Sequence, residues 1–308
     1  MTDWQLNIPI AFIIFNRPDT TERVFAEIAK AKPPKLLVIA DGPRGRPGEA
    51  EKCASARAVI ERVDWDCEVL TNYSEVNLGC KNRVASGLDW VFEQVPEAII
   101  LEDDCLPDPT FFRFCEELLE RYRDDQRIAM ISGDNFQFGR QRCETSYYFS
   151  RFHHIWGWAS WRRAWRHYDR DVKAWPEIRG SQVLASVVSN RRELNYWTNV
   201  FQAVYDGKID TWDYQWVLSS WAQGMLAIIP EVNLISNIGF GVDATHTHGA
   251  SIYADMAVSP MAFPLRHPRM FLPNAYADGY TSREMFSGSV ILRVAQKIKA
   301  LLRSKNQS

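Results

Sequence analysis

A short apolar segment that ends in three consecutive acids constrains the fold of this 308-residue chain more than any other feature. Residues 98–101 are all apolar, and Glu102, Asp103 and Asp104 follow directly. Such a run predicts a strand buried on both faces of a sheet, with the acids at its carboxyl end, where open α/β sheets bind ligands. Because adjacent carboxylates repel one another, a bound Mg²⁺ or Mn²⁺ is the economical explanation. A solvated acidic turn or a helix N-terminus with capping acids is the alternative.

Strand-like and helix-like segments alternate through the first third of the chain. Apolar runs predict strands at residues 8–15, 35–40 and 67–72. One helix is expected to start near Pro18, a second to end near residue 63, and a third to cover residues 81–94. The alternation predicts an α/β fold with a doubly wound, mostly parallel sheet and helices on both of its faces.

The pattern changes after the acidic triplet. A helix is expected at residues 111–122 and one more strand at residues 128–133. Nine of the 12 tryptophans then fall between residues 156 and 221. The second part of the chain is therefore expected to differ from the first in packing and in role.

Composition excludes several classes of protein. A hydrophobic content of 46% suffices for a large core, and a net charge of −2 without a basic, aromatic-rich patch gives no reason to expect a nucleic-acid partner. The six cysteines form no C-x-x-C pair, which argues against a zinc site. The N-terminus lacks the basic and apolar regions of a signal peptide, and no segment has the roughly 18 apolar residues of a membrane span. We therefore expect a reduced, cytoplasmic protein.

The C-terminal tail has the pattern of a basic amphipathic helix. Between residues 291 and 305, apolar residues recur at helical spacing among lysines and arginines, and no acid follows Glu284. Such a helix either lies peripherally on the anionic inner face of a membrane or docks on its own domain, and both alternatives stay open.

Three polar loops are expected at the same edge of the sheet as the acidic triplet. Arg17 follows the first strand and Asp41 follows the second. Residues 77–83, which include Lys81 and Arg83, precede the helix that leads into the strand with the acidic triplet. In a parallel sheet these loops open on one edge. Cationic side chains, carboxylates and backbone that a ligand can approach closely at glycines together suit the binding of a nucleotide diphosphate with a metal ion. For each cation, the alternative is a solvated position at a helix start.

In this order, the segments resemble the GT-A glycosyltransferases, in particular the inverting family-2 group and the N-acetylglucosaminyltransferase that initiates complex N-glycan branches. The resemblance covers roughly residues 8–250. The segments that carry it are Phe15-Asn16-Arg17-Pro18, Ile39-Ala40-Asp41-Gly42, Asn77-Leu78-Gly79, Glu102-Asp103-Asp104, the aromatic run from Trp156 to Trp165, and Thr211-Trp212-Asp213-Tyr214-Gln215-Trp216.

The resemblance implies metal-dependent, inverting transfer of a sugar from a nucleotide sugar, a UDP-sugar by preference, to a saccharide or lipid-linked acceptor. Asp104 matches the direct ligand of Mn²⁺ or Mg²⁺, Glu102 belongs to the same metal motif or only supports the turn, and Asp103 lies toward the ribose or a metal-bound water. Asp41 matches the contact to uracil or ribose. Asp213 matches the general base that deprotonates the acceptor hydroxyl.

Three further residues are candidates for the same site. Trp156 and Trp158 offer flat, apolar faces on which a sugar can stack, and the alternative for both is a place in the core. His246 matches a histidine that related transferases place on the diphosphate or metal, and the alternative is a buried, hydrogen-bonded histidine.

The resemblance also suggests a domain division. A GT-A domain is expected at residues 1–270, with a nucleotide-binding half at 1–110 and an acceptor-binding half at 111–270. Residues 271–308 form a C-terminal extension that contains the basic amphipathic pattern.

Two other functions are compatible with a sheet of this kind. A non-catalytic nucleotide- or carbohydrate-binding protein is favoured by the tryptophan content and by E-D-D in place of the commoner D-x-D. A sugar-phosphate nucleotidyltransferase would carry a glycine-rich, basic loop after the first strand, which Asn16-Arg17-Pro18-Asp19 does not supply.

Overall fold

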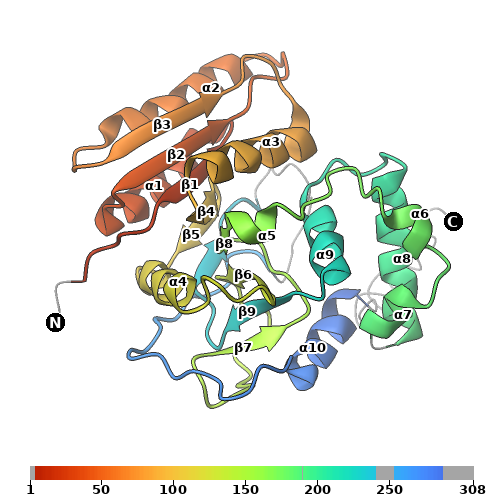
Figure 1. The fold of residues 1–308 in the computed structure, drawn as a ribbon. Coiled ribbons are helices and arrows are strands. Elements are labelled where there is room, and N and C mark those ends of the chain that lie inside the picture. The colour runs from red at the N-terminus through yellow and green to blue at the C-terminus, as the bar shows by residue number, and fades with distance from the viewer. Residues whose placement is uncertain (1–3, 189, 241–252, 287–308) are drawn as a thin grey trace, which may run out of the picture.

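The computed structural model describes residues 4–188, 190–240 and 253–286, so His246 and the basic pattern of the tail lie outside the described residues. Within these ranges, one eight-stranded sheet has the order β3-β2-β1-β4-β8-β6-β9-β7, and β10 and β5 pair separately (Figure 1). The strands are β1 (Ile10–Ile14), β2 (Lys35–Ala40), β3 (Glu68–Tyr73), β4 (Glu97–Glu102), β5 (Cys105–Pro107), β6 (Ile128–Ser132), β7 (Tyr147–Ser150), β8 (Trp158–Trp161), β9 (Leu226–Pro230) and β10 (Ile235–Asn237).

Helices connect most of these strands. They are α1 (Pro18–Ala31), α2 (Glu49–Ala58), α3 (Gly79–Gln94), α4 (Thr110–Arg121), α5 (Arg162–Trp165), α6 (Trp175–Ile178), α7 (Val183–Val187), α8 (Arg191–Tyr205), α9 (Asp213–Ala222) and α10 (Ala275–Thr281), with the short 3₁₀ helix η1 (Val59–Arg62) and the short π-helix η2 (Ser282–Phe286). The predicted α/β fold with a mostly parallel sheet is confirmed.

The first half of the sheet is parallel. β2 pairs with β1 and β3, and β1 pairs with β4, all in the same direction. Every residue of β1 is buried, which explains why this strand is a continuous apolar run. The carboxyl ends of β1, β2 and β4 therefore meet at one edge, as the sequence predicts.

The second half of the sheet is mixed. β8 runs antiparallel between β4 and β6, with Trp158 opposite Ile100 and Ser160 opposite Met130. β6 and β9 are parallel to each other, and β7 is antiparallel to β9 at the edge. The sequence predicts neither β7 nor β8, because four aromatic-rich residues are too few to show an alternating period.

Helices cover both faces of the sheet (Figure 1). Phe12 of β1 belongs to the core that includes residues of α1 and α4, whereas its neighbour Ile13 belongs to the core that includes residues of α3, α5 and α9. Successive side chains of a strand point to opposite faces, so the single strand contributes to both cores. A third cluster, around Trp197 of α8 and Trp221 of α9, forms the core of a helical lobe beside the sheet.

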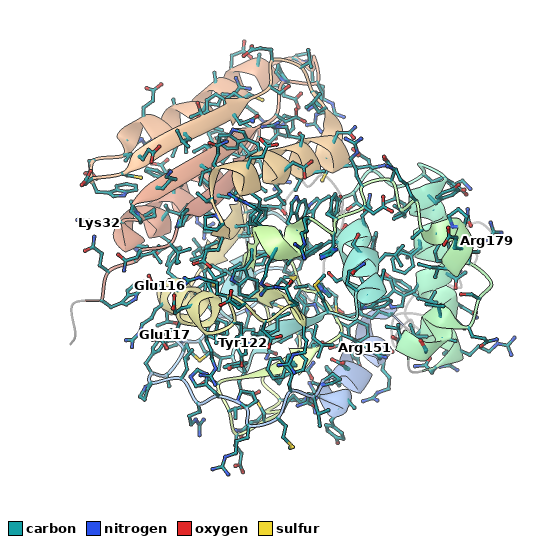
Figure 2. The ribbon with its side chains drawn as sticks, viewed as in Figure 1. Lys32, Glu116, Glu117, Tyr122, Arg151 and Arg179 are labelled. Carbon is teal, nitrogen blue, oxygen red and sulfur yellow. The ribbon has the colours of Figure 1, made fainter. Side chains whose placement is uncertain are left out.

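A buried charged network ties α10 to the rest of the protein. Arg151, labelled in Figure 2, has guanidinium nitrogens 3.2 Å from Glu193 of α8 and 3.8 Å from Asp278 of α10. The hydroxyl of Ser150 donates to Asp278, and that of Ser282 donates to Glu193. None of the described helices is both long enough and apolar enough to cross a membrane.

Candidate active site

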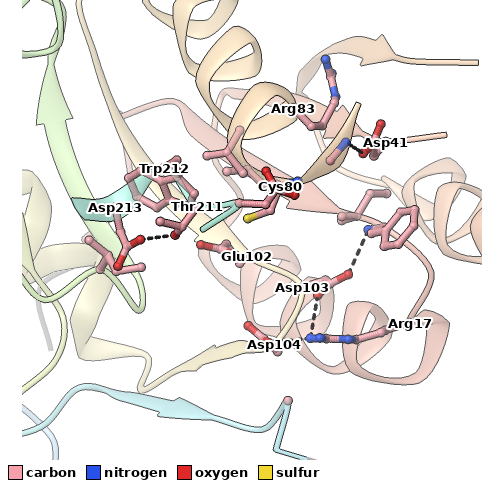
Figure 3. A pocket seen from close by; sticks show the side chains of 18 of the residues that line it. Arg17, Asp41, Cys80, Arg83, Glu102, Asp103, Asp104, Thr211, Trp212 and Asp213 are labelled. Atoms are coloured by element: carbon pink, nitrogen blue, oxygen red, sulfur yellow. Dashed lines mark hydrogen bonds and ion pairs between the residues drawn. The ribbon is translucent and has the colours of Figure 1, made fainter. Parts of the chain in front are cut away.

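A cavity of about 560 Å³ opens at the edge where β1, β2 and β4 end (Figure 3). Segments from both halves of the chain line it. From the first half come Phe15, Arg17, Asp41, Arg44, Asn77, Gly79, Cys80, Arg83 and the acidic triplet, and from the second come Trp156, the segment from Ile209 to Tyr214, Asn237, Gly239 and Phe240.

The acidic triplet lies at the carboxyl end of β4. Glu102 is the last residue of the strand, and Asp103 and Asp104 form the turn into β5. One guanidinium nitrogen of Arg17 lies 2.5 Å from Asp104 Oδ2 and 3.6 Å from Asp103 Oδ1. The backbone N–H of Phe15 donates to the other oxygen of Asp103 at 2.9 Å. In this structure, the cation that offsets the repulsion between the acids is therefore Arg17.

The carboxyl groups of Glu102 and Asp103 are hard to ionise. Burial, together with the charge of Asp104, raises the pKa of Glu102 to about 8 and that of Asp103 to about 7. Arg17 opposes both shifts without cancelling them. An additional positive charge at this position would favour the ionised forms.

The donor atoms here suit a hard divalent cation. Among the described residues, no three histidine, cysteine or acidic side chains are grouped closely enough to enclose a metal ion. Mg²⁺ typically binds one or two carboxylates and takes its other ligands from water and substrate phosphates, so Asp104 and Asp103 fit that pattern. A Cβ atom at Gly239 would lie 2.1 Å from Asp104 Oδ2, which shows that this glycine leaves the space for the carboxylate.

Asp41 is already engaged by the protein. Its two carboxylate oxygens accept hydrogen bonds from the backbone N–H groups of Gly42, Leu78 and Gly79, and from the side-chain amide of Asn77, at 2.9–3.2 Å. Burial nevertheless raises the pKa of Asp41. The carboxylate thus holds the Asn77-Leu78-Gly79 loop against β2, in addition to facing the cavity.

The two other predicted cations differ in position. Arg83 lines the cavity, and its guanidinium donates to the backbone and side-chain oxygens of Asn72 at 2.5 and 2.7 Å. Lys81 Nζ lies 3.4 Å from Asp171, and Lys81 is not among the described residues that line the cavity. The structure therefore brings Arg17 and Arg83 to the cavity and leaves Lys81 outside it.

Asp213 lies across the cavity from the Asp104 turn. It is the first residue of α9, and the hydroxyl of Thr211 donates to its Oδ1. Figure 3 shows Glu102 between Asp213 and Asp104, and the negative charges of both contribute to the raised pKa of Glu102. The predicted base and the predicted metal ligands therefore share one cavity.

The two candidate tryptophans have different positions. Trp156 lines the cavity and makes edge-to-face contacts with Phe136 and Phe240. Trp158 is fully buried in β8, where its ring stacks on Trp212 at a centroid distance of 5.6 Å. A ring enclosed in this way has no face for a sugar, so for Trp158 the structure favours the core alternative.

Sequence reasoning missed Asp210 and Arg44. Asp210 lines the cavity and accepts hydrogen bonds from the backbone N–H groups of Cys80 and Lys81. Its place three residues before Asp213 was a signal in the sequence. Arg44 lines the cavity, pairs with Glu49 at 2.5 Å and lies over the Phe15 ring.

Comparisons with known proteins reach the fold level only. No family model matches the sequence, and no curated protein matches it. The mannosyltransferase PcManGT from Pyrobaculum calidifontis, solved in complex with GDP-Man and Mn²⁺, is similar with 13% identity and a TM-score of 0.40, over 72% of this chain and 70% of that chain. A UDP-glucose pyrophosphorylase complexed with UDP-glucose is similar with 9% identity and a TM-score of 0.34, over 72% of this chain and 90% of that chain. Similarities this weak say nothing of activity.

Proposed function

We propose that the protein is a metal-dependent, inverting glycosyltransferase of the GT-A type, which transfers a sugar from a nucleotide sugar to a saccharide or lipid-linked acceptor. One observation carries the proposal. A single cavity has the acidic triplet and Arg17 on one wall and Asp213 on the other. The motifs that resemble GT-A enzymes in the sequence converge on that cavity.

Each wall suits one part of the reaction. Arg17 and Arg83 supply positive charge for the phosphates of the donor, and Asp104 and Asp103 would hold Mn²⁺ or Mg²⁺. The metal ion would neutralise the charge of the departing diphosphate. Asp213 would take the proton from the acceptor hydroxyl, oriented by the hydrogen bond from Thr211. Inversion requires no second carboxylate as a nucleophile.

A second candidate function is a non-catalytic nucleotide- or saccharide-binding protein. It is favoured by the ion pair between Arg17 and Asp104, which satisfies the proposed metal ligand without a metal ion. The two candidates differ in turnover, since only the enzyme releases the nucleoside diphosphate from its donor.

Calorimetry with UDP tests the donor site. We expect binding that depends on Mn²⁺, that is lost in Asp104→Ala, and that persists in Asp206→Ala, which removes an exposed acid outside the cavity. A thermal-shift panel of UDP-, GDP- and dTDP-sugars identifies the nucleotide, because ligands that bind the native state raise its stability. Metal-independent UDP binding, or intact binding in Asp104→Ala, would rule out the proposed metal site.

Measurement of donor turnover separates the enzyme from the binding protein. We expect the wild type to release UDP slowly from the matching UDP-sugar, even in water, and Asp213→Asn to lose that activity. Removal of a general base typically costs about 10²- to 10⁴-fold in rate. A protein that binds the donor and never turns it over belongs to the second class.

A further inference from the structure

The N-terminus of α3 is held by two carboxylates that come from the two halves of the chain. The N-cap residue, Leu78, provides no side-chain cap, and the first turn contains no acid. Instead, Asp41 accepts the N–H groups of Leu78 and Gly79, and Asp210 accepts those of Cys80 and Lys81 at 3.1 and 3.0 Å. The four N–H groups that a helix leaves without intrahelical partners are therefore all satisfied from outside the helix.

Gly79 makes the close approach of Asp210 possible. Its φ angle is +79°, a conformation that favours glycine, and a Cβ atom there would lie 2.8 Å from Asp210 Oδ2. The carboxylate thus lies directly on the backbone of the first helical turn. Since Asp210 is 130 residues from Cys80 in sequence, the contact is a tertiary link between distant segments of the chain.

The same short segment carries Asp213. Thr211 follows Asp210, its hydroxyl donates to Asp213, and its carbonyl accepts a hydrogen bond from the side chain of the fully buried Gln215 at 2.5 Å. The segment is therefore fixed at one end by α9, on which Gln215 lies, and at the other by the N-terminus of α3. Without the second attachment, the segment would be held by α9 and by Trp212, which is buried against Trp158 and accepts a hydrogen bond from Tyr168 at its carbonyl.

We propose that Asp210 is a positioning residue. It ties the segment of residues 210–213 to the N-terminus of α3 and so sets the distance between Asp213 and the cavity wall that carries Arg17 and the acidic triplet. The role assigned to Asp213 rests on the proposed function, whereas the tie itself does not. A carboxylate at a helix N-terminus is stabilised both by its hydrogen bonds and by the helix dipole, so its removal takes both contributions from the link.

Hydrogen exchange of the full-length protein tests the tie without any substrate. In Asp210→Ala we expect faster exchange in peptides that cover residues 79–83 and 209–215, and in Asp210→Asn, which keeps an acceptor oxygen and the side-chain volume, a smaller increase. Asp206→Ala, which removes an exposed acid near the end of α8, is the matched control and leaves both peptides protected as in the wild type. Unchanged protection of residues 209–215 in Asp210→Ala would overturn the proposal.

Steady-state kinetics test the positioning role. A misplaced reacting group costs up to about 100-fold in rate, so we expect a 10- to 100-fold lower kcat in Asp210→Ala, with partial rescue in Asp210→Asn and an unchanged KM for the donor. A wild-type kcat in Asp210→Ala, alongside an inactive Asp213→Asn, would overturn the positioning role. A wild type without turnover would instead refute the proposed function and this role with it, and the exchange result would still decide the tie.

Discussion

The guanidinium of Arg17 is bound to an oxygen of Asp104 that a metal ion would share. Both side chains are mostly shielded from solvent, with exposed fractions of 18% and 16%, so their attraction is screened less than that of a surface pair. In the proposed metal site, Arg17 would therefore compete with a divalent cation in the absence of a nucleotide. A donor diphosphate would offer the guanidinium another anionic partner and would so link metal binding to donor binding.

This competition predicts that Arg17→Gln binds Mn²⁺ more tightly than the wild type when no nucleotide is present. Removal of a neighbouring unit charge is worth at least about 1.4 kcal/mol in a partly buried site, or about tenfold in affinity. Paramagnetic resonance of free Mn²⁺ measures the change. Arg127→Gln, which breaks an exposed pair with Asp125, serves as the control. Equal Mn²⁺ affinity in Arg17→Gln and the wild type would contradict the argument.

At the residue scale, sequence identifies chemistry better than it identifies partners. The sequence motifs predict Asp104 and Asp213 as site residues, and both line the cavity. The hydrogen bonds of Asp41 to the α3 loop could not be foreseen, because they depend on the approach of a loop 36 to 38 residues away. Lys81 looked equivalent to Arg83, yet it turns toward Asp171, a residue of the other half of the chain.

Among the elements, those of the first 133 residues are predicted well, including the short strands β1 and β6, whereas in the second half even the 15-residue helix α8 is not. The strand at residues 35–40 and the helices α3 and α4 lie within two residues of their predicted bounds. β8 escaped prediction because its residues Trp-Ala-Ser-Trp are buried from end to end and show no polar alternation. Its antiparallel insertion between β4 and β6 could be known only from the tertiary structure.

The position of β8 inside the sheet predicts that loss of Trp158, which lies in this strand, destabilises the protein more than loss of Trp156, which lies just before it. Trp158→Ala removes a fully buried ring that contacts Trp165, Trp212 and Trp216, and we expect a loss of about 3–5 kcal/mol in the free energy of unfolding. Trp156→Ala removes a partly exposed ring from the cavity wall and is expected to cost clearly less. Urea denaturation of both variants measures the difference, and equal losses would contradict the distinction between core and wall.

For the whole molecule, the sheet is the frame that joins the two halves. β4 from the first half pairs with β8 from the second, and the carboxyl end of β4 carries the acids that face the segment before α9. A change in the charge of this shared region therefore acts on the stability of the entire fold. Because burial raises the pKa of Glu102 and of Asp103, the effect of their charge on stability can be measured as a change in stability with pH.

The raised pKa of Glu102 predicts that the metal-free protein loses stability as the pH rises from 7 to 8. The native pKa is about 8 against an ordinary value of 4.5, so over this range the native state holds a proton that the unfolded state has lost. Stability then falls with pH, by at most about 1.4 kcal/mol per pH unit for one group. The buried histidines have the opposite effect, because burial lowers the pKa of His153 to about 4, but that contribution belongs mainly to lower pH.

Urea denaturation at pH 7 and pH 8 in the presence of EDTA tests this dependence. We expect Glu102→Gln to show a flatter profile than the wild type, because its side chain holds no titrating proton. Addition of Mn²⁺ and UDP should flatten the wild-type profile as well, since a cation in the cavity favours the ionised carboxylates. A smaller slope should remain in Glu102→Gln, because Asp103 has a native pKa of about 7. A wild-type stability that rises between pH 7 and 8, or a slope in Glu102→Gln as steep as that of the wild type, would contradict the role assigned to Glu102.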